Sequence, residues 1–186
     1  MNESCYNHPM GRNRYTIYEP THPHFITCTV LNWIPIFTNQ ESVNIIIDSL
    51  KYLQKSDNLT IHAYVILENH LHIIAKSNDI SQSMARFKAH TARTLIKLLA
   101  EKNVTMILEQ LRFYKKAHKK DREYQLWQEG IKPKLIQSEN MMLRHIDYIH
   151  NNPLKRGFVD EAKHWRYSSA RDYEGVNGLL EIERVW

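Results

Sequence analysis

Two histidines separated by one residue, His70 and His72, are the side chains of this sequence best suited to bind a metal ion. They lie at the end of an apolar run that starts at Ala63 and is interrupted mainly by Glu68-Asn69 and by the histidines themselves. Side chains of a β-strand alternate between its two faces, so a strand here places both imidazoles on one face. Neutral imidazole is a common metal ligand, and a strand holds two such ligands rigidly.

The spacing alone does not separate a metal site from a structural pair. With 11 His in 186 residues, chance gives roughly 0.6 pairs of this spacing, and the chain has two. The second pair, His22 and His24, flanks Pro23 in a turn-like segment, and we interpret it as a structural pair in a loop. For His70 and His72, a buried strand pair and a metal site are equally compatible with the pattern.

Size and composition indicate one folded domain. The 186 residues are 42% hydrophobic and include four Trp and ten Tyr, which is enough for a hydrophobic core. We expect a single domain over 1–186, with an N-terminal extension to about residue 24 and a C-terminal tail over about 158–186. The polar start, the two Cys and the short longest apolar stretch (25–37) predict a cytoplasmic protein with no membrane segment.

The charge of the chain favours a polyanionic partner. Its formal net charge is +5, and the excess of cations is concentrated over 115–122 and at Lys155-Arg156. A solvated helix face is the alternative interpretation of the longer cluster, because basic runs of this length are common on helix surfaces.

Hydrophobic periodicity predicts an α+β domain. The expected strands are 25–31, 59–66 and 70–76, with Glu68-Asn69 as a hairpin turn and a short edge strand at 124–128. The expected helices are 40–55, Asp79 or Ser81 to about 102, 104–120 and 139–151. We expect Ser138 to cap the last helix and Pro153 to end it. This order predicts a small antiparallel β-sheet with helices packed on it.

Tyr148 lies beside the apolar stripe of the helix 139–151, on the side that faces polar residues. The predicted stripe consists of Met142, Leu143, Ile146 and Ile149. Arg144 and Asn152, four residues before and after Tyr148, are its neighbours on the helix surface. Taken alone, this is a half-exposed tyrosine that packs its ring and keeps its hydroxyl in water.

The histidine pair and this tyrosine occur together with other motifs in a fixed order. Tyr-Ile-His-Asn-Asn-Pro-Leu-Lys-Arg-Gly spans 148–157, Trp-Gln-Glu-Gly precedes it at 127–130, and Trp-Arg-Tyr-Ser-Ser-Ala follows at 165–170. With these motifs the chain resembles the single-tyrosine HUH transposases and, among them, the REP-associated tyrosine transposases. The resemblance extends from about residue 25 to the end. One departure is Leu67-Glu68-Asn69, where relatives usually have a proline shortly before the histidines.

The resemblance implies a fold, an enzymatic activity and a site. The fold is that of the ferredoxin-like, RRM-like HUH nucleases. The activity is metal-dependent cleavage and joining of single-stranded DNA at hairpin-forming repeats, through a 5′-phosphotyrosine intermediate. Tyr148 is then the nucleophile, His70 and His72 are metal ligands, and Asn152 is a third ligand to Mg²⁺ or Mn²⁺. Relatives act as monomers or homodimers on hairpin DNA, which implies a nucleoid-associated protein.

Cationic residues near these motifs are candidate DNA contacts, because cations bind the phosphate backbone. They are Arg144, Lys115, Lys116, Lys119, Lys120, Lys155 and Arg156. We interpret Glu68, two residues before His70, as an exposed carboxylate of the predicted hairpin turn.

Two other functions are open at this point. One is a hairpin-binding regulator that keeps the fold and does not cleave DNA. The other is a small metal-dependent hydrolase that activates water, although the chain has neither a His-Glu-x-x-His motif nor a cysteine ligand set.

Overall fold

The computed structural model describes residues 19, 22–130 and 133–184, so most of the predicted N-terminal extension lies outside the described residues. The strands are β1 (His24–Thr29), β2 (Thr60–Leu67), β3 (His70–Lys76) and β4 (Lys134–Leu135). The α-helices are α1 (Gln40–Ser56), α2 (Ile80–Glu101), α3 (Thr105–Phe113), α4 (Glu139–Lys155) and α5 (Ala170–Tyr173). Two 3-10 helices span Leu31–Trp33 and Ala162–His164. Within the described ranges, no helix has the length and apolar character needed to cross a bilayer.

The four strands form one antiparallel sheet in the order β2-β3-β1-β4, which confirms the predicted α+β class. Strand β3 lies inside the sheet between β2 and β1. His72 is opposite Thr27 of β1 and Val65 of β2, and His70 is opposite Thr29 and Leu67. The histidine pair is therefore held by strand pairing on both sides.

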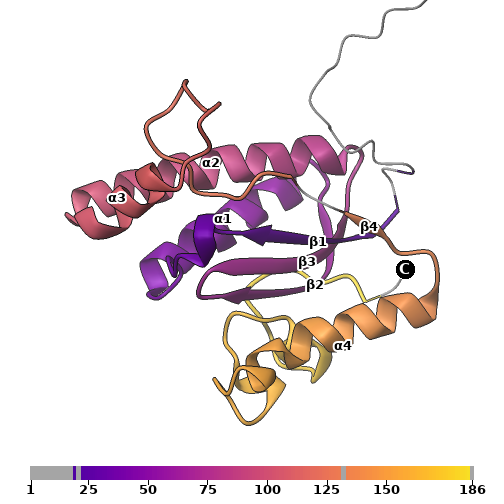
Figure 1. Ribbon diagram of the computed structural model, residues 1–186. Coiled ribbons are helices and arrows are strands. Elements are labelled where there is room, and N and C mark those ends of the chain that lie inside the picture. The colour runs from indigo at the N-terminus through magenta and orange to yellow at the C-terminus, as the bar shows by residue number, and fades with distance from the viewer. Residues whose placement is uncertain (1–18, 20–21, 131–132, 185–186) are drawn as a thin grey trace, which may run out of the picture.

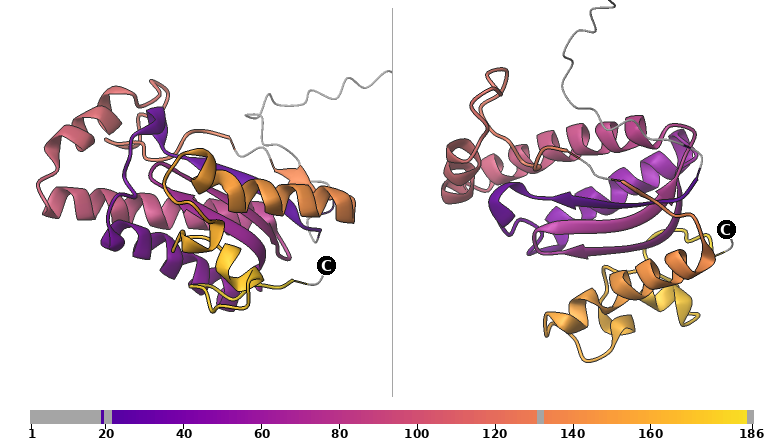
Figure 2. Two further views of the ribbon diagram at one scale, coloured as in Figure 1. Left: turned by 90° about the horizontal axis from the view of Figure 1, so that it is seen from below. Right: turned by 45° about the vertical axis from the view of Figure 1, so that its right-hand side comes forward.

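Helices cover both faces of the sheet, as Figures 1 and 2 show: α1 and α2 lie on one side and α4 lies on the other. Alternation along the strands separates two hydrophobic cores. Leu71 and Ile73 of β3 belong to the larger core with α1 and α2, whereas Ile74 packs with Ile146 and Ile149 of α4. His70 and His72 have the same parity as Ile74, so they face α4.

The predicted hairpin between β2 and β3 is confirmed. Leu67 is opposite His70, which leaves Glu68 and Asn69 as a two-residue turn. The backbone carbonyl of Glu68 accepts a hydrogen bond from Phe37 N, and that of Asn69 accepts one from Val30 N. The segment between β1 and α1 therefore holds the turn next to the histidines in place.

The predicted end of α4 at Pro153 is wrong, because the helix continues to Lys155. The residue that terminates the helix is Gly157, which follows the C-cap Arg156 and has φ +71°. Phe158 N donates to Pro153 O and Gly157 N donates to Leu154 O, the two hydrogen bonds of a Schellman motif. Only Gly adopts this backbone region without steric cost. Pro153 lies within the last turn of the helix, where it has no N–H to donate to the carbonyl four residues earlier, and its ring is buried.

Several smaller predictions are also wrong. Helix α3 ends at Phe113, so the basic cluster 115–122 lies in a loop rather than on a helix, because no apolar stripe continues beyond Leu111. The segment 124–128 forms only one β-bridge, between Trp127 and Val30, and the edge strand is β4. Leu143, predicted to lie on the apolar stripe of α4, is half exposed, and the buried stripe includes Met142, Ile146 and Ile149. His24 is the first residue of β1 and not part of a loop.

Replacing Gly157 by Ala should destabilise the protein by about 1–2 kcal/mol, since an L-residue at positive φ is strained. A Cβ at this position meets no other atom within 4 Å, so a steric clash adds nothing to the loss. Urea unfolding at 25 °C measures the difference. Gly157→Asn is the comparison and should lose less, because Asn tolerates this backbone region. Equal stability of Gly157→Ala and the parent would contradict this account of the α4 terminus.

Candidate active site

His70 and His72 lie side by side on the sheet face that α4 covers. Their ring centroids are 4.7 Å apart and the ring planes meet at 77°. Both side chains are buried, with 4% and 6% of their surface exposed. The prediction that both imidazoles lie on one face of a strand is thus confirmed.

Nδ1 of each imidazole is within hydrogen-bond distance of a neighbouring side chain. Nδ1 of His70 is 2.6 Å from Asn69 Oδ1, and Asn69 Nδ2 donates to the carbonyl of Trp33. An amide oxygen only accepts, so Nδ1 of His70 carries the proton and its Nε2 keeps a lone pair. Nδ1 of His72 is 2.8 Å from Thr27 Oγ1. Fixing the orientation of imidazoles through Nδ1 is how proteins prepare metal ligands.

Both imidazoles are neutral at physiological pH. Burial lowers the pKa of His70 to about 4, helped by the nearby Arg156 guanidinium. Burial also lowers the pKa of His72 to about 3, with a further contribution from His70. A metal ion binds only the neutral form, so no proton has to be removed before binding.

Tyr148 projects from α4 over the histidines of the same chain. Its ring centroid is 5.3 Å from that of His72 and 6.0 Å from that of Phe25, and 40% of the residue is exposed. The ammonium group of Lys155 is 5.7 Å from the centroid of the Tyr148 ring. The sequence prediction of a half-exposed tyrosine is confirmed, and the structure adds its position beside the histidine pair.

A cleft of about 980 Å³ opens between the sheet and α4 at this point. His72 and Thr27 lie on its sheet side, and Tyr148 and Arg144 lie on its helix side. Residues 128–130 complete the wall. The cleft therefore has room for an extended ligand beside both the tyrosine and one histidine.

Asn152 lies on the buried stripe of α4 one turn after Tyr148, with 9% of its surface exposed. Within the described part of the chain its side-chain amide has no hydrogen-bond partner. The described residues also contain no group of three or more His, Cys, Asp or Glu that could hold a metal ion. A metal site here would therefore use two imidazoles and oxygen donors of another kind, such as the Asn152 amide, water or phosphate. The neutral pair with both Nδ1 atoms engaged fits such a site.

The predicted DNA-binding cations fall into two groups, one on or next to α4 and one in the loop that follows α3. Arg144 lines the cleft, and Lys155 lies by the tyrosine ring. Arg156 instead forms an ion pair with Glu68 of the hairpin turn. Glu68 is thus a partly buried, paired carboxylate rather than the exposed one expected from the sequence. This pair joins the end of α4 to the turn that precedes His70.

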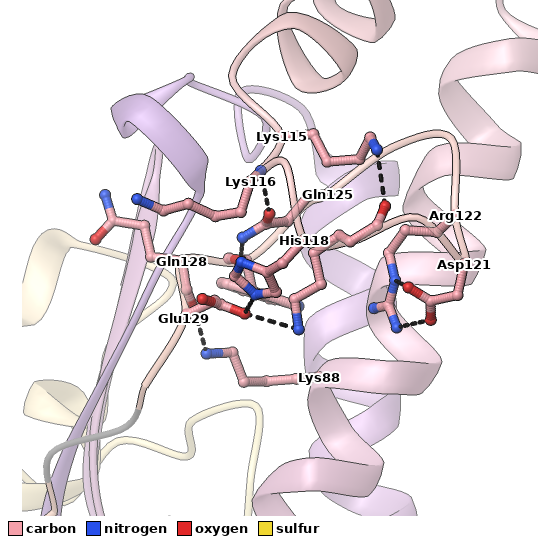
Figure 3. Close-up of polar contacts among 11 residues, drawn as sticks. Lys88, Lys115, Lys116, His118, Asp121, Arg122, Gln125, Gln128 and Glu129 are labelled. Atoms are coloured by element: carbon pink, nitrogen blue, oxygen red, sulfur yellow. Dashed lines mark hydrogen bonds and ion pairs between the residues drawn. The ribbon is translucent and has the colours of Figure 1, made fainter. Parts of the chain in front are cut away.

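The loop over 114–130 is organised by internal polar contacts (Figure 3). Lys119 is ion-paired with Glu129 at 2.7 Å, and Lys115 Nζ donates to the carbonyl of Lys119. Hydrogen bonds from Lys119 and His118 lower the pKa of Glu129 to about 2. Among the described residues, Lys116 and Lys120 have no ion-pair partner. The basic cluster is thus partly used to hold Glu129 at the wall of the cleft.

Sequence reasoning missed Thr27 and Asn69 as partners of the histidines. Asn69 adjoins His70, and an amide beside a candidate ligand was the available signal. Thr27 gave no such signal, because its contact depends on the register between β1 and β3. Phe25 was missed for the same reason: its ring stacks against His72 at 5.4 Å and against His145 at 4.5 Å.

Comparison with known proteins gives one relative by sequence. A Haemophilus influenzae protein named "Putative REP-associated tyrosine transposase" is 32% identical over 111 residues, which are 58% of this chain. The chain is thus similar in sequence to a protein of that name over the matched residues. The match spans about half of the relative, 56% of its length. No protein-family model matches the chain.

The fold of a REP-associated tyrosine transposase is also similar. The solved structure of such a transposase bound to a REP hairpin superposes with a TM-score of 0.63, covering 95% of this chain and 94% of that one. The sequence identity is 17%, so this similarity establishes the fold. The fold that the resemblance implies is therefore confirmed.

Thr27→Val should destabilise the protein by about 1–3 kcal/mol, since the nearly isosteric change leaves the buried Nδ1 of His72 without its partner. Urea unfolding measures the loss. The control is Thr94→Val on α2, where the hydroxyl bonds only the carbonyl of His90 in its own helix. We expect that control to stay within about 0.5 kcal/mol of the parent. Similar small effects at both positions would show that the Thr27 contact does not hold the imidazole.

Proposed function

We propose that this protein is a metal-dependent endonuclease and strand transferase for single-stranded DNA at hairpin-forming repeats, and that it acts through a 5′-phosphotyrosine. The observation that carries the proposal is the position of Tyr148, whose ring lies 5.3 Å from that of His72 within one chain. The sequence relationship to a REP-associated tyrosine transposase supports the same activity. So does the fold similarity to a transposase bound to a REP hairpin.

The proposed reaction exchanges one phosphodiester for another. The phenolic oxygen of Tyr148 attacks phosphorus, the bond from phosphorus to the 3′ oxygen breaks, and the phenolic proton reaches that oxygen through water. The products are a 5′-phosphotyrosine and a free 3′-OH. Reversal, or attack by another 3′-OH, joins DNA without an external energy source.

The chain provides groups that position and stabilise the phosphate in this reaction. Arg144 on the cleft wall and Lys155 beside the tyrosine ring attract the charged oxygens of the phosphate. Phenol ionises near pH 10, so a nucleophilic phenol needs nearby positive charge to react at neutral pH. Lys155 contributes such charge from the same helix as the nucleophile.

We propose that Mg²⁺ or Mn²⁺ binds to His70 and His72 through Nε2, with Asn152 as an oxygen ligand. Bound there, the metal would supply Lewis acidity to the scissile phosphate. The chain prepares the site by keeping both imidazoles neutral and oriented. We propose Lys116 and Lys120, which have no ion-pair partner among the described residues, as contacts to the DNA backbone outside the cleft.

Incubation of the full chain with a labelled single-stranded hairpin and Mn²⁺ should give a covalent adduct that survives denaturation. Tyr148→Phe should abolish the adduct while it retains hairpin binding, because only the nucleophilic oxygen is removed. A denaturing gel measures the adduct and fluorescence anisotropy measures binding. Tyr173→Phe, a partly buried tyrosine whose hydroxyl bonds the carbonyl of His62, is the control that keeps the adduct.

The other outcomes select other functions. Hairpin binding without an adduct in either metal would favour the non-cleaving regulator. Phosphodiester cleavage that survives Tyr148→Phe and is lost in His72→Ala would favour the water-activating hydrolase. An adduct regained on mixing Tyr148→Phe with His72→Ala would show that the site is shared between subunits rather than complete within one chain.

Mn²⁺ should bind more tightly than Mg²⁺, because imidazole ligands favour the softer ion. Isothermal titration calorimetry of the chain with each metal, in the absence of DNA, measures both affinities. His70→Ala and His72→Ala should each lose binding, whereas His90→Ala, exposed on α2, should retain it. Equal or tighter binding of Mg²⁺ would count against ligation by the histidines.

A further inference from the structure

We infer that Trp33 is a stacking platform for an unpaired nucleobase next to the scissile phosphate. This rests on the proposed function and extends it to a residue that neither the sequence motifs nor the cleft identifies. The inference combines the exposure of the ring, its position against His70 and the backbone that holds it there.

Trp33 is exposed although the other large apolar residues of its segment are buried. The residue has 55% of its surface exposed, while Leu31, two positions before it, and Ile34, directly after it, are 6% and 3% exposed and belong to the larger core. A tryptophan next to a hydrophobic core normally buries its ring, since the ring is the largest apolar surface a residue offers. Its exposure therefore requires a local cause.

The cause is the backbone. Asn32 and Trp33 have φ of 51° and 57°, two consecutive residues in the left-handed region. Asn tolerates this region, but a bulky residue such as Trp adopts it only when the surroundings enforce it. The enforced turn places the ring against His70, with ring centroids 5.5 Å apart and planes at 77°. Strain of this kind gathers at functional sites, which motivates the inference.

Asn69 connects the tryptophan to the candidate metal ligand. Its Nδ2 donates to the carbonyl of Trp33, and its Oδ1 accepts from Nδ1 of His70. One side chain thus sets both the orientation of the imidazole and the position of the tryptophan. The exposed face of the ring is held at a fixed place relative to the histidine pair.

A nucleobase is the occupant that fits this position. A phosphate at His70 and His72 is flanked by two nucleotides, and each of them carries a base. In a single strand these bases have no pairing partner and are free to stack on an aromatic ring. Bases of any identity stack on tryptophan, so the contact adds affinity for single strands without demanding a sequence. A hairpin with no single-stranded flank offers no such base.

The test compares two labelled hairpins by fluorescence anisotropy, one with single-stranded flanks and one blunt-ended. The full chain carrying Tyr148→Phe is the parent for all variants, so that no covalent product forms. We expect Trp33→Ala to bind the flanked hairpin about fivefold or more weakly, and Trp33→Phe to lose less, because loss of base stacking has this magnitude. Affinity for the blunt hairpin should change by less than about twofold.

Two further variants separate stacking from folding. Trp33→Gly relieves the backbone strain and should be at least as stable as Trp33→Ala, with the same loss of affinity. Tyr52→Ala on α1, with 59% exposure, removes an equally exposed ring that lies on the opposite face of the sheet from the histidines. It should bind both hairpins like the parent.

A direct readout is the quenching of tryptophan fluorescence by an unlabelled single strand. Quenching in the parent that disappears in Trp33→Phe supports stacking at this ring. The inference is overturned if Trp33→Ala binds the flanked hairpin like the parent, or weakens both hairpins equally. If the parent binds neither hairpin, the proposed function fails together with the inference, a result distinct from both of these.

Discussion

The position of β3 inside the sheet is the constraint on which the rest of the structure depends. Its residues alternate between two environments, so Leu71 and Ile73 enter the larger core while His70 and His72 face α4. A shift of pairing by one residue would exchange these sets and bury two polar rings among the side chains of α1 and α2. The cost of that exchange fixes the register, and the register in turn brings Thr27 to His72. Apolar burial on one face thus orients the polar groups on the other.

The tyrosine side of the candidate site is positioned by a different set of contacts. Met142, Ile146 and Ile149 pack α4 onto the sheet, and the Arg156–Glu68 ion pair ties its end to the hairpin turn. Tyr148 lies beside this stripe rather than in it, so its ring contacts His72 and remains partly exposed. The short β4 brings the chain back across the sheet just before α4 begins.

The sequence predicted the elements that periodicity determines: three strands, the hairpin at Glu68-Asn69, helices α1 and α2, and the cap of α4 at Ser138. It also placed both histidines on one face, because alternation along a strand is a local property. It failed where the outcome depends on contacts distant in sequence. The end of α4 is determined by Gly157 rather than by Pro153. The ion-pair partner of Glu68 is Arg156, which lies 88 positions further along the chain. The surroundings of His72 depend on strand pairing, which no local pattern encodes.

The two hydrophobic cores have unequal size, and this has a consequence for how the protein loses its proposed activity. The larger core joins the sheet to α1 and α2, whereas the smaller one attaches α4. Regions with fewer buried apolar contacts open at lower free energy than the rest of a fold. Detachment of α4 would carry the tyrosine away while the histidines stay in an intact sheet. Heat or denaturant should therefore separate Tyr148 from the histidine pair before the sheet unfolds, so that the proposed activity is lost first and regained without refolding of the domain.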